Sequence, residues 1–295
     1  MGQRSGRGCG RWDSRQRPGS DRCSTAPVPD AVRASGSAST PVGPPGSAPG
    51  ERRILVLWAT PRSTSTAFEW MMRMRGDFVC LHEPFGPAYY RGADRRTTRP
   101  DENPLEPGRT YATTWAEILD ARNDGPVFAK DFPNYIMHMA DGGFLDHFHH
   151  TFLIRDPAKA LASMYNHWDE FTMDEASYEA LRIMFDLVVD RYREIPPVID
   201  SDDLLDDTAG LVEAYCMAVG IPFISKALDW RKGDRDEVRW YGGDWHDALS
   251  ASTGLQRQPT EYRAQIDDVP FLQAMYARCR PHYDALAEHK LAPPR

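Results

Sequence analysis

The chain lacks the phosphate-binding sequence GxxxxGK[ST], which nucleotide kinases and ATPases carry between a strand and a helix. At the corresponding junction here, residues 58–66 read WATPRSTST and contain neither glycine nor lysine. Conventional hydrolysis of ATP or GTP is therefore not expected, although a relative of that architecture is.

Paired cysteines, long apolar runs and a basic net charge are also missing. The five cysteines are far apart and form no CxxC pair, which is typical of reduced thiols in a cytosolic protein. No apolar run approaches a membrane span, and the N-terminus has no apolar signal-peptide core. The formal net charge of −8 argues against broad nucleic-acid binding. We therefore expect a cytoplasmic protein that binds neither membrane nor nucleic acid.

Residues 1–50 differ in composition from the rest of the chain. Gly, Pro and Ser make up 24 of these 50 residues, so the segment cannot bury enough surface to offset its ordering entropy. We predict a disordered N-terminal tail; a targeting segment and a start site assigned too far upstream are the alternatives. Residues 51–295 are predicted to form a single domain. With 28 basic and 40 acidic side chains there, an anion site needs its cations concentrated locally.

Apolar runs alternate with helical patterns in this predicted domain. Unbroken apolar runs indicate strands buried on both faces, at residues 54–58, 78–81, 126–129, 151–154 and 197–199. Helical spacing predicts helices after residue 66, at 113–122, 134–140, from 157, and at 175–194, 207–219 and 267–288. Strands separated by helices predict an α/β, P-loop-like three-layer fold, with a central parallel sheet of about five strands flanked by helices.

Polar side chains stand where four of the predicted strands end. Because the carboxyl ends of parallel strands meet at one edge, where ligands bind, we expect convergence of Arg62, Glu83, Lys130 and Arg155.

A hydroxyl cluster, Ser63, Thr64, Ser65 and Thr66, precedes the first predicted helix. Free backbone N–H groups and the helix dipole make such a junction an anion site, and Arg62 adds a positive charge. An ordinary Ser/Thr helix cap is the alternative.

A second candidate anion site combines Arg155 with Ser163. Arg155 ends a predicted strand, and Ser163 lies eight residues later, two turns into the following helix. Both side chains can reach one anion beside the strand end. The alternative is that Arg155 pairs with Asp156 and that Ser163 is a tolerated helix residue.

Together, TPRSTST and RDPAKALAS resemble two motifs of the sulfotransferases that use 3′-phosphoadenosine 5′-phosphosulfate (PAPS). The bacterial members with a carboxylate base look most similar, over about residues 53–254. In that family the first loop, P-[KR]-S-G-[ST]-T, binds the 5′-phosphosulfate, and the later Arg and Ser bind the 3′-phosphate. The resemblance implies these roles for residues 62–66 and for Arg155 and Ser163. Thr64 stands where many members have glycine, so it is either strained or kept at ordinary backbone angles.

A weaker match lies further along the chain. Arg231, Lys232 and Gly233 resemble the late RKG contact of cytosolic members to the 3′-phosphate and adenine, with a mobile basic loop as the alternative.

The resemblance implies an EC 2.8.2-like enzyme that moves a sulfuryl group in line, without a metal, to a hydroxyl or amine of a small organic acceptor. Arg62 would help to hold the transferred group, and Lys130 would neutralise the leaving phosphate. Glu83 is the expected general base. His82, which should point away from Glu83 along the strand, is an alternative, as are Asp131 and His167.

Two other functions stay open. Cytosolic members keep a catalytic His where this chain has Phe132, which would suit a non-catalytic nucleotide-binding module. A nucleotide-dependent phosphotransferase is disfavoured by the missing lysine. Such folds also allow a homodimer.

Histidines and tryptophans supply the remaining candidates. His147 and His149 share one face of a strand and, with His150, could hold zinc, but no Cys or carboxylate follows at ligand spacing. No metal is therefore expected. The acceptor site could be walled by Trp115, Trp168, Trp230 and Trp245, which sequence cannot separate from core packing.

Overall fold

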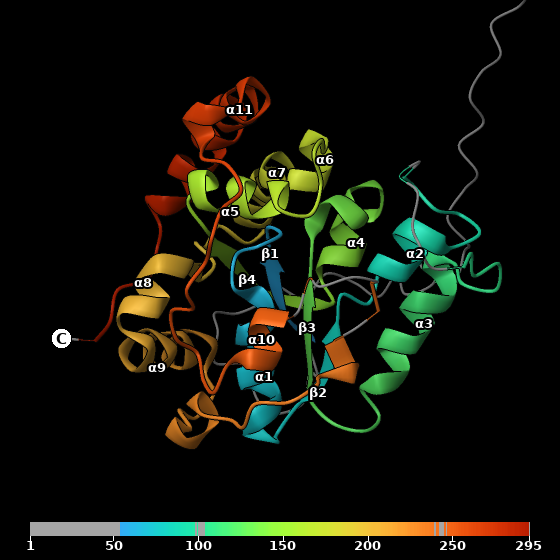
Figure 1. Ribbon diagram of the computed structural model, residues 1–295. Coiled ribbons are helices and arrows are strands. Elements are labelled where there is room, and N and C mark those ends of the chain that lie inside the picture. The colour runs from blue at the N-terminus through green and yellow to red at the C-terminus, as the bar shows by residue number, and fades with distance from the viewer. Residues whose placement is uncertain are drawn as a thin grey trace, which may run out of the picture. The chain divides into compact units, whose positions relative to one another are not determined.

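A parallel sheet of five strands, in the order β2-β3-β1-β4-β5, forms the centre of the protein (Figure 1). This computed structural model describes residues 54–97, 99, 104–238, 240–241, 245 and 247–294, so the predicted tail at 1–50 lies outside the described residues. The strands are β1 (Ile54–Ala59), β2 (Val79–His82), β3 (Val127–Asp131), β4 (Phe148–Ile154) and β5 (Val198–Asp200). The expected α/β fold with a five-stranded parallel sheet is confirmed.

Helices connect these strands and cover both faces of the sheet (Figure 1). Between β1 and β4 lie α1 (Ser65–Arg75), α2 (Gly86–Arg91), α3 (Tyr111–Ala121) and α4 (Gly142–Leu145). Between β4 and β5 lie α5 (Pro157–Tyr165), α6 (Met173–Ala176) and α7 (Tyr178–Tyr192). After β5 come α8 (Ser201–Asp206), α9 (Thr208–Val219), α10 (Asp247–Ala251) and α11 (Pro270–Ala287). Of the described helices, none has the length and apolarity that a membrane crossing requires.

The side chains of β4 point alternately to the two faces of the sheet, so each face has its own part of the core. Phe152 packs edge-on against Phe185 of α7, with 5.4 Å between ring centroids. Thr151 points the other way, and its hydroxyl lies 3.4 Å from the hydroxyl of Tyr215 on α9. Phe68 of α1 packs on the same Tyr215 ring at 5.0 Å. Helices α1 and α9 therefore cover one face and α7 the other.

The helices that follow β1 and β4 leave toward opposite faces, although these two strands are neighbours. Helix α1 lies on the Tyr215 face, whereas α5 shares a buried apolar cluster with α7 and α11. Such a divergence leaves a crevice at the carboxyl ends of the two strands, which is where ligands bind in open α/β sheets. The two predicted anion loops both start there.

Strand β4 begins at Phe148, earlier than the predicted Thr151. The extension brings His150 into the core, where both of its ring nitrogens have partners. Its Nδ1 accepts from Trp58 Nε1 at 3.0 Å, and its Nε2 lies 3.0 Å from the carbonyl oxygen of Leu145. A polar ring whose bonds are satisfied is compatible with a buried strand, so apolar composition alone underestimated its length.

The helices differ from the predicted ones in three further places. The helix predicted at 175–194 is divided at Ser177. This residue has a φ of 62° and lies between the end of α6 and the start of α7. The helix predicted at 113–122 begins at Tyr111, because Thr110 is its cap. The helix predicted at 134–140 is replaced by two short 3-10 turns.

Helix α7 ends at a residue with unfavourable backbone angles, which generates a stability prediction. Arg193 follows the helix with φ 58° and is largely exposed. A Cβ in the left-handed region costs about 1 kcal/mol, which glycine avoids. Arg193→Gly is therefore expected to raise the free energy of unfolding by about 0.5–1 kcal/mol, measured by urea denaturation. Arg193→Ala keeps the Cβ, so an equal increase in the free energy of unfolding with alanine would show that the effect comes from the charge.

Candidate functional site

The loop between β1 and α1 turns its backbone toward a cavity. Arg62 and Thr64 adopt left-handed angles, with φ of 63° and 71°. The first N–H groups of α1, from Ser65 onward, have no carbonyl partner within the helix, and residues 61–67 all line the cavity. The loop therefore has the anion-binding arrangement that its sequence predicted.

Of the two alternatives that the sequence left open for Thr64, the structure has the strained one. Its left-handed φ is the one that glycine adopts most easily. A contact on the far side of the loop accompanies the strain, since Thr64 Oγ1 lies 2.7 Å from Ser201 Oγ at the start of α8. Backbone strain of this kind is commonly found at ligand sites.

The two predicted anion motifs meet directly. Arg62 donates through Nε to Ser163 Oγ at 2.9 Å, and Arg155 donates to the carbonyl oxygen of Arg62 at 2.6 Å. The carbonyl of Trp245 accepts a further bond from Arg62, at 2.9 Å. Two guanidinium groups and one hydroxyl are thus held together at the ends of neighbouring strands.

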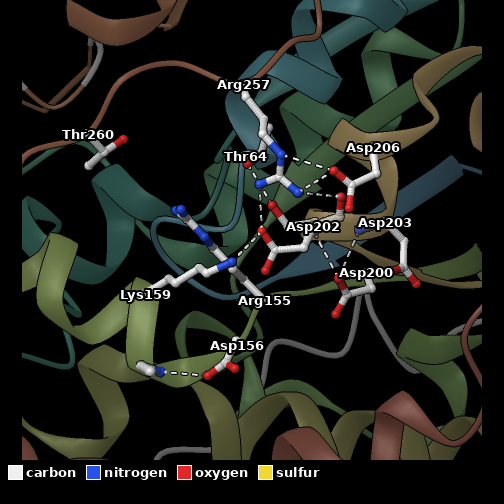
Figure 2. Close-up of polar contacts among 12 residues, drawn as sticks. Thr64, Arg155, Asp156, Lys159, Asp200, Asp202, Asp203, Asp206, Arg257 and Thr260 are labelled. Atoms are coloured by element: carbon white, nitrogen blue, oxygen red, sulfur yellow. Dashed lines mark hydrogen bonds and ion pairs between the residues drawn. The ribbon is translucent and has the colours of Figure 1, made fainter.

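Two more cations lie on this side of the cavity, and both contact Asp202 (Figure 2). Lys159 Nζ is 2.8 Å and Arg257 NH1 is 3.0 Å from Asp202 Oδ1, and Arg257 also pairs with Asp206. Partial burial alone would raise the pKa of Asp202, but Lys159 and Arg257 lower it. Sequence reasoning missed both cations. Lys159 was detectable four residues after Arg155, whereas Arg257 follows no pattern.

The segment resembling the late RKG contact lies elsewhere. Arg231, Lys232 and Gly233 are exposed, and the Gly233 N–H donates to the carbonyl oxygen of Ser250 at 3.0 Å. None of the three is among the described residues that line the cavity, whereas Arg257 is. Their predicted contact with a ligand therefore finds no support in this placement.

Glu83 brings a carboxylate to the cavity immediately beyond β2. Its N–H donates to the carbonyl oxygen of Lys130 at 2.7 Å. Its Oε1 accepts a hydrogen bond from Lys130 Nζ, and its Oε2 accepts one from Trp240 Nε1 at 3.1 Å. Lys130 is fully buried and does not line the cavity. It therefore contacts the expected base, and its role in neutralising a leaving phosphate stays a prediction.

His82 does not point away from Glu83, contrary to the prediction. Its Nε2 lies 3.7 Å from Glu83 Oε1, because Glu83 takes a φ of 42° and leaves the alternation of the strand. On its other side, His82 Nδ1 is 2.5 Å from Glu69 Oε2. Burial alone would raise the pKa of Glu69, but His82, Lys130 and Arg73 lower it to about 2. Glu69 is therefore ionised at neutral pH.

The other two candidate bases are not among the described residues that line the cavity. Asp131 is buried and accepts from the N–H groups of Phe85 and Phe132. Burial raises the pKa of Asp131 to about 8. The His167 ring stacks on Trp245, with centroids 4.4 Å apart. Of the four candidate bases, Glu83 is the one whose side chain is reached from the cavity.

The cavity has a volume of about 780 Å³ and two chemically different sides. The side formed by the β1–α1 loop, α5 and residues 247–262 carries all the basic residues in the described lining, namely Arg62, Arg155, Lys159 and Arg257. The side around Glu83 is largely aromatic, with Tyr90, Phe132, Tyr135, Trp168, Trp240 and Tyr241 in the lining, and Trp245 contacts both Tyr241 of this side and Arg62 of the other. Of the four candidate tryptophans, Trp168 and Trp245 line the cavity, whereas Trp115 packs on Phe144 and Trp230 bonds to Ser252.

The histidine group lies in and next to β4 and away from this cavity. His147 contacts Trp115, and His150 bonds to Trp58 and Leu145. Within the part of the chain that the structure describes, no group of three His, Cys, Asp or Glu side chains could hold a metal ion.

Comparison with known proteins links this geometry to a family. The family model described as "Sulfotransferase domain" matches residues 53–287. A curated relative is the branched-chain-amino-acid aminotransferase-like protein 2 of Arabidopsis thaliana, 23% identical over 240 residues, which are 80% of this chain and 42% of the relative. This chain spans about two fifths of the length of the curated relatives that it matches.

Two solved sulfotransferase domains are similar at low identity. The domain from the Synechococcus PCC 7002 olefin synthase has a TM-score of 0.47 and 15% identity, covering 82% of this chain and 96% of that one. The domain from the curacin biosynthetic pathway has a TM-score of 0.43 and 12% identity, covering 77% and 97%.

The lowered pKa of Glu69 generates a prediction about acid stability. Because its folded-state pKa is about 2, below the ordinary 4.5, Glu69 contributes stability above pH 4.5 that is lost as pH falls toward 2. Glu69→Gln should lower the free energy of unfolding at pH 7 by about 3 kcal/mol and flatten its fall between those pH values. Denaturant titrations across pH measure this, with Glu117→Gln, in an exposed ion pair, as control. Parallel curves for wild type and Glu69→Gln would contradict the prediction.

Proposed function

Because the chain belongs to the sulfotransferase domain family, we propose that it transfers a sulfuryl group from PAPS to a hydroxyl or amine of a small organic acceptor. The observation that carries the proposal is the contact of Arg62 with Ser163 and Arg155, which unites two anion motifs at one cavity. PAPS carries phosphate groups at two positions of one nucleotide, so its site needs two anion-binding motifs that lie no further apart than a nucleotide is long.

The residues present fit this donor. A volume of about 780 Å³ is within the range of small-molecule sites. We assign the 5′-phosphosulfate to Arg62 and to the amides and hydroxyls of residues 63–66. The 3′-phosphate is assigned to Arg155 and Ser163, with Lys159 and Arg257 beside them. These four cations supply the local positive charge that an acidic domain otherwise lacks.

The chemistry follows from the charges on the two sides of the cavity. The acceptor oxygen or nitrogen forms a bond to sulfur as the bond from sulfur to the phosphate oxygen breaks, and Glu83 takes the acceptor proton. Arg62 and the N-terminus of α1 stabilise the negative charge that develops on the leaving phosphate. Lys130 keeps Glu83 ionised and oriented before transfer, since its ammonium is bonded to Glu83 Oε1.

Removing the proposed base separates chemistry from binding. Glu83→Gln should lower kcat by at least about 100-fold, because an amide cannot accept the proton. The Kd for 3′,5′-adenosine bisphosphate, measured by calorimetry, should stay within about twofold of wild type. Arg155→Ala should instead raise the Kd for the bisphosphate.

Three outcomes distinguish the functions considered. Transfer from labelled PAPS that Glu83→Gln abolishes supports the proposal, and transfer that survives the substitution removes Glu83 as base. Tight binding of the bisphosphate by wild type, with no transfer to any phenol, sugar or amine, would indicate a nucleotide-binding module. Selective binding of ATP with magnesium would indicate a phosphotransferase.

The acceptor is proposed to be an aromatic or apolar molecule without negative charge. Tyr90, Trp240 and Tyr241 lie 5.3–5.8 Å apart between ring centroids, beside Glu83. The carboxylates of Glu83 and Glu175 also line this side, and no described basic residue does. Aromatic faces bind flat apolar groups, whereas an anion would find no available cation among the described residues here, because Lys130 is bonded to Glu83 and Arg99 to Glu175.

A matched series of acceptors tests this charge preference. We expect kcat/KM for 2-(4-hydroxyphenyl)ethanol to exceed that for 4-hydroxyphenylacetate by about tenfold or more, because the two differ mainly in a carboxylate that would lose hydration here without gaining a cation. Initial rates with labelled PAPS measure both. Equal rates, or a preference for the anion, would contradict the assignment of this side to the acceptor.

A further inference from the structure

Four ionisable side chains, Glu69, His82, Glu83 and Lys130, form a row from α1 to the cavity. His82 lies between two carboxylates: its Nδ1 is 2.5 Å from Glu69 Oε2, and its Nε2 is 3.7 Å from Glu83 Oε1. Glu83 lines the cavity, whereas Glu69 and Lys130 are fully buried. The row therefore connects a carboxylate that a small molecule can reach with one that it cannot.

The position of His82 is unusual for its surroundings. It lies opposite Lys130 of β3, on the face of the edge strand β2 that α1 covers, and its side chain is 3% exposed. Side chains buried to this degree are usually apolar. Lys130 already balances the charge of Glu83, and Arg73 already donates two hydrogen bonds to Glu69. Burying further polar groups has a cost. Charge balance therefore does not require His82.

The neighbours of His82 determine which of its nitrogens carries the proton. Arg73 donates two hydrogen bonds to Glu69, as to an ionised carboxylate, and an ionised carboxylate only accepts hydrogen bonds. His82 therefore donates to it from Nδ1. In the neutral ring, the lone pair of Nε2 then faces Glu83 Oε1.

We propose that Glu69 and His82 are positioning residues that make Glu83 a stronger base, an inference that rests on the proposed function. Lys130 alone would hold Glu83 as a weakly basic carboxylate, because a bound cation favours the ionised form. The lone pair of His82 Nε2 opposes the negative charge of Glu83 and so raises its affinity for the acceptor proton. The reversed tautomer would donate from Nε2 to Oε1 and lower that affinity.

Glu69→Gln should produce the reversed tautomer. Arg73 donates to Glu69 Oε1 at 2.9 and 2.7 Å, so the carbonyl oxygen of a glutamine would stay there and its NH₂ group would face His82 Nδ1. The ring must then accept at Nδ1 and carry its proton at Nε2. A comparable change of histidine tautomer is costly in catalytic triads.

The kinetic test compares wild type with Glu69→Gln. We expect kcat to fall about 10- to 100-fold, while the acceptor KM and the Kd for 3′,5′-adenosine bisphosphate stay within about twofold. The acidic limb of the kcat profile should move to lower pH, because Glu83 becomes a weaker base. The charged or titratable groups around this pair include Glu69 and Arg73 from α1, Lys130 and Asp131 from β3, Tyr90 from α2, and Tyr135.

Asp77→Asn is the matched control. Its carboxylate is 2.7 Å from Arg75 at the end of α1, in a half-exposed ion pair that does not include Glu83. This variant should keep the wild-type kcat and pH profile. Rates are corrected for the folded fraction, measured by circular dichroism.

A second readout does not depend on activity. The ¹⁵N shifts of labelled histidine, assigned with His82→Gln, should show a proton on Nδ1 of His82 in wild type and on Nε2 in Glu69→Gln. A wild-type proton on Nε2, or an unchanged kcat and pH profile in Glu69→Gln, would overturn this inference and leave the proposed function intact. Wild type that binds the bisphosphate but transfers nothing would overturn both.

Discussion

The hydrogen bond from Arg62 to Ser163 joins parts of the chain that leave the sheet in opposite directions. β1 and β4 are neighbours, but the helices that follow them cover opposite faces, so their loops open a crevice at the strand ends. Arg62 crosses that crevice, and Arg155 donates to its carbonyl oxygen from the other side. These bonds hold two guanidinium groups close together in a domain whose overall charge is negative.

Carboxylates keep the charges around the cavity in fixed positions. Asp202 contacts both Lys159 and Arg257 (Figure 2), and Glu83 contacts Lys130. Groups held in this way need little reorganisation when a charged ligand arrives, which is the main requirement for stabilising a charged transition state. The same pairing also limits the repulsion among cations that a phosphate-binding site gathers together.

The sequence predicted the fold well because its signals are local. Unbroken apolar runs at β1, β3 and β4 and helical spacing between them are enough to indicate a parallel sheet covered on both faces. Element boundaries were less accurate where a polar side chain finds a buried partner, as at His150, or where a single left-handed residue divides a helix, as at Ser177.

For the candidate site, the sequence by itself determined which residues lie at strand ends and helix N-termini. Arg155 and Ser163 could be recognised because the eight residues between them span a strand end and two turns of α5, and Arg62 because it follows β1. Only the tertiary structure decided that Arg257 and Trp240 reach the cavity, since they lie in irregular segments without a period. It also decided that His82 faces Glu83, because a positive φ at Glu83 breaks the alternation on which the prediction relied. Periodicity describes regular backbone, and the site is assembled where regular backbone ends.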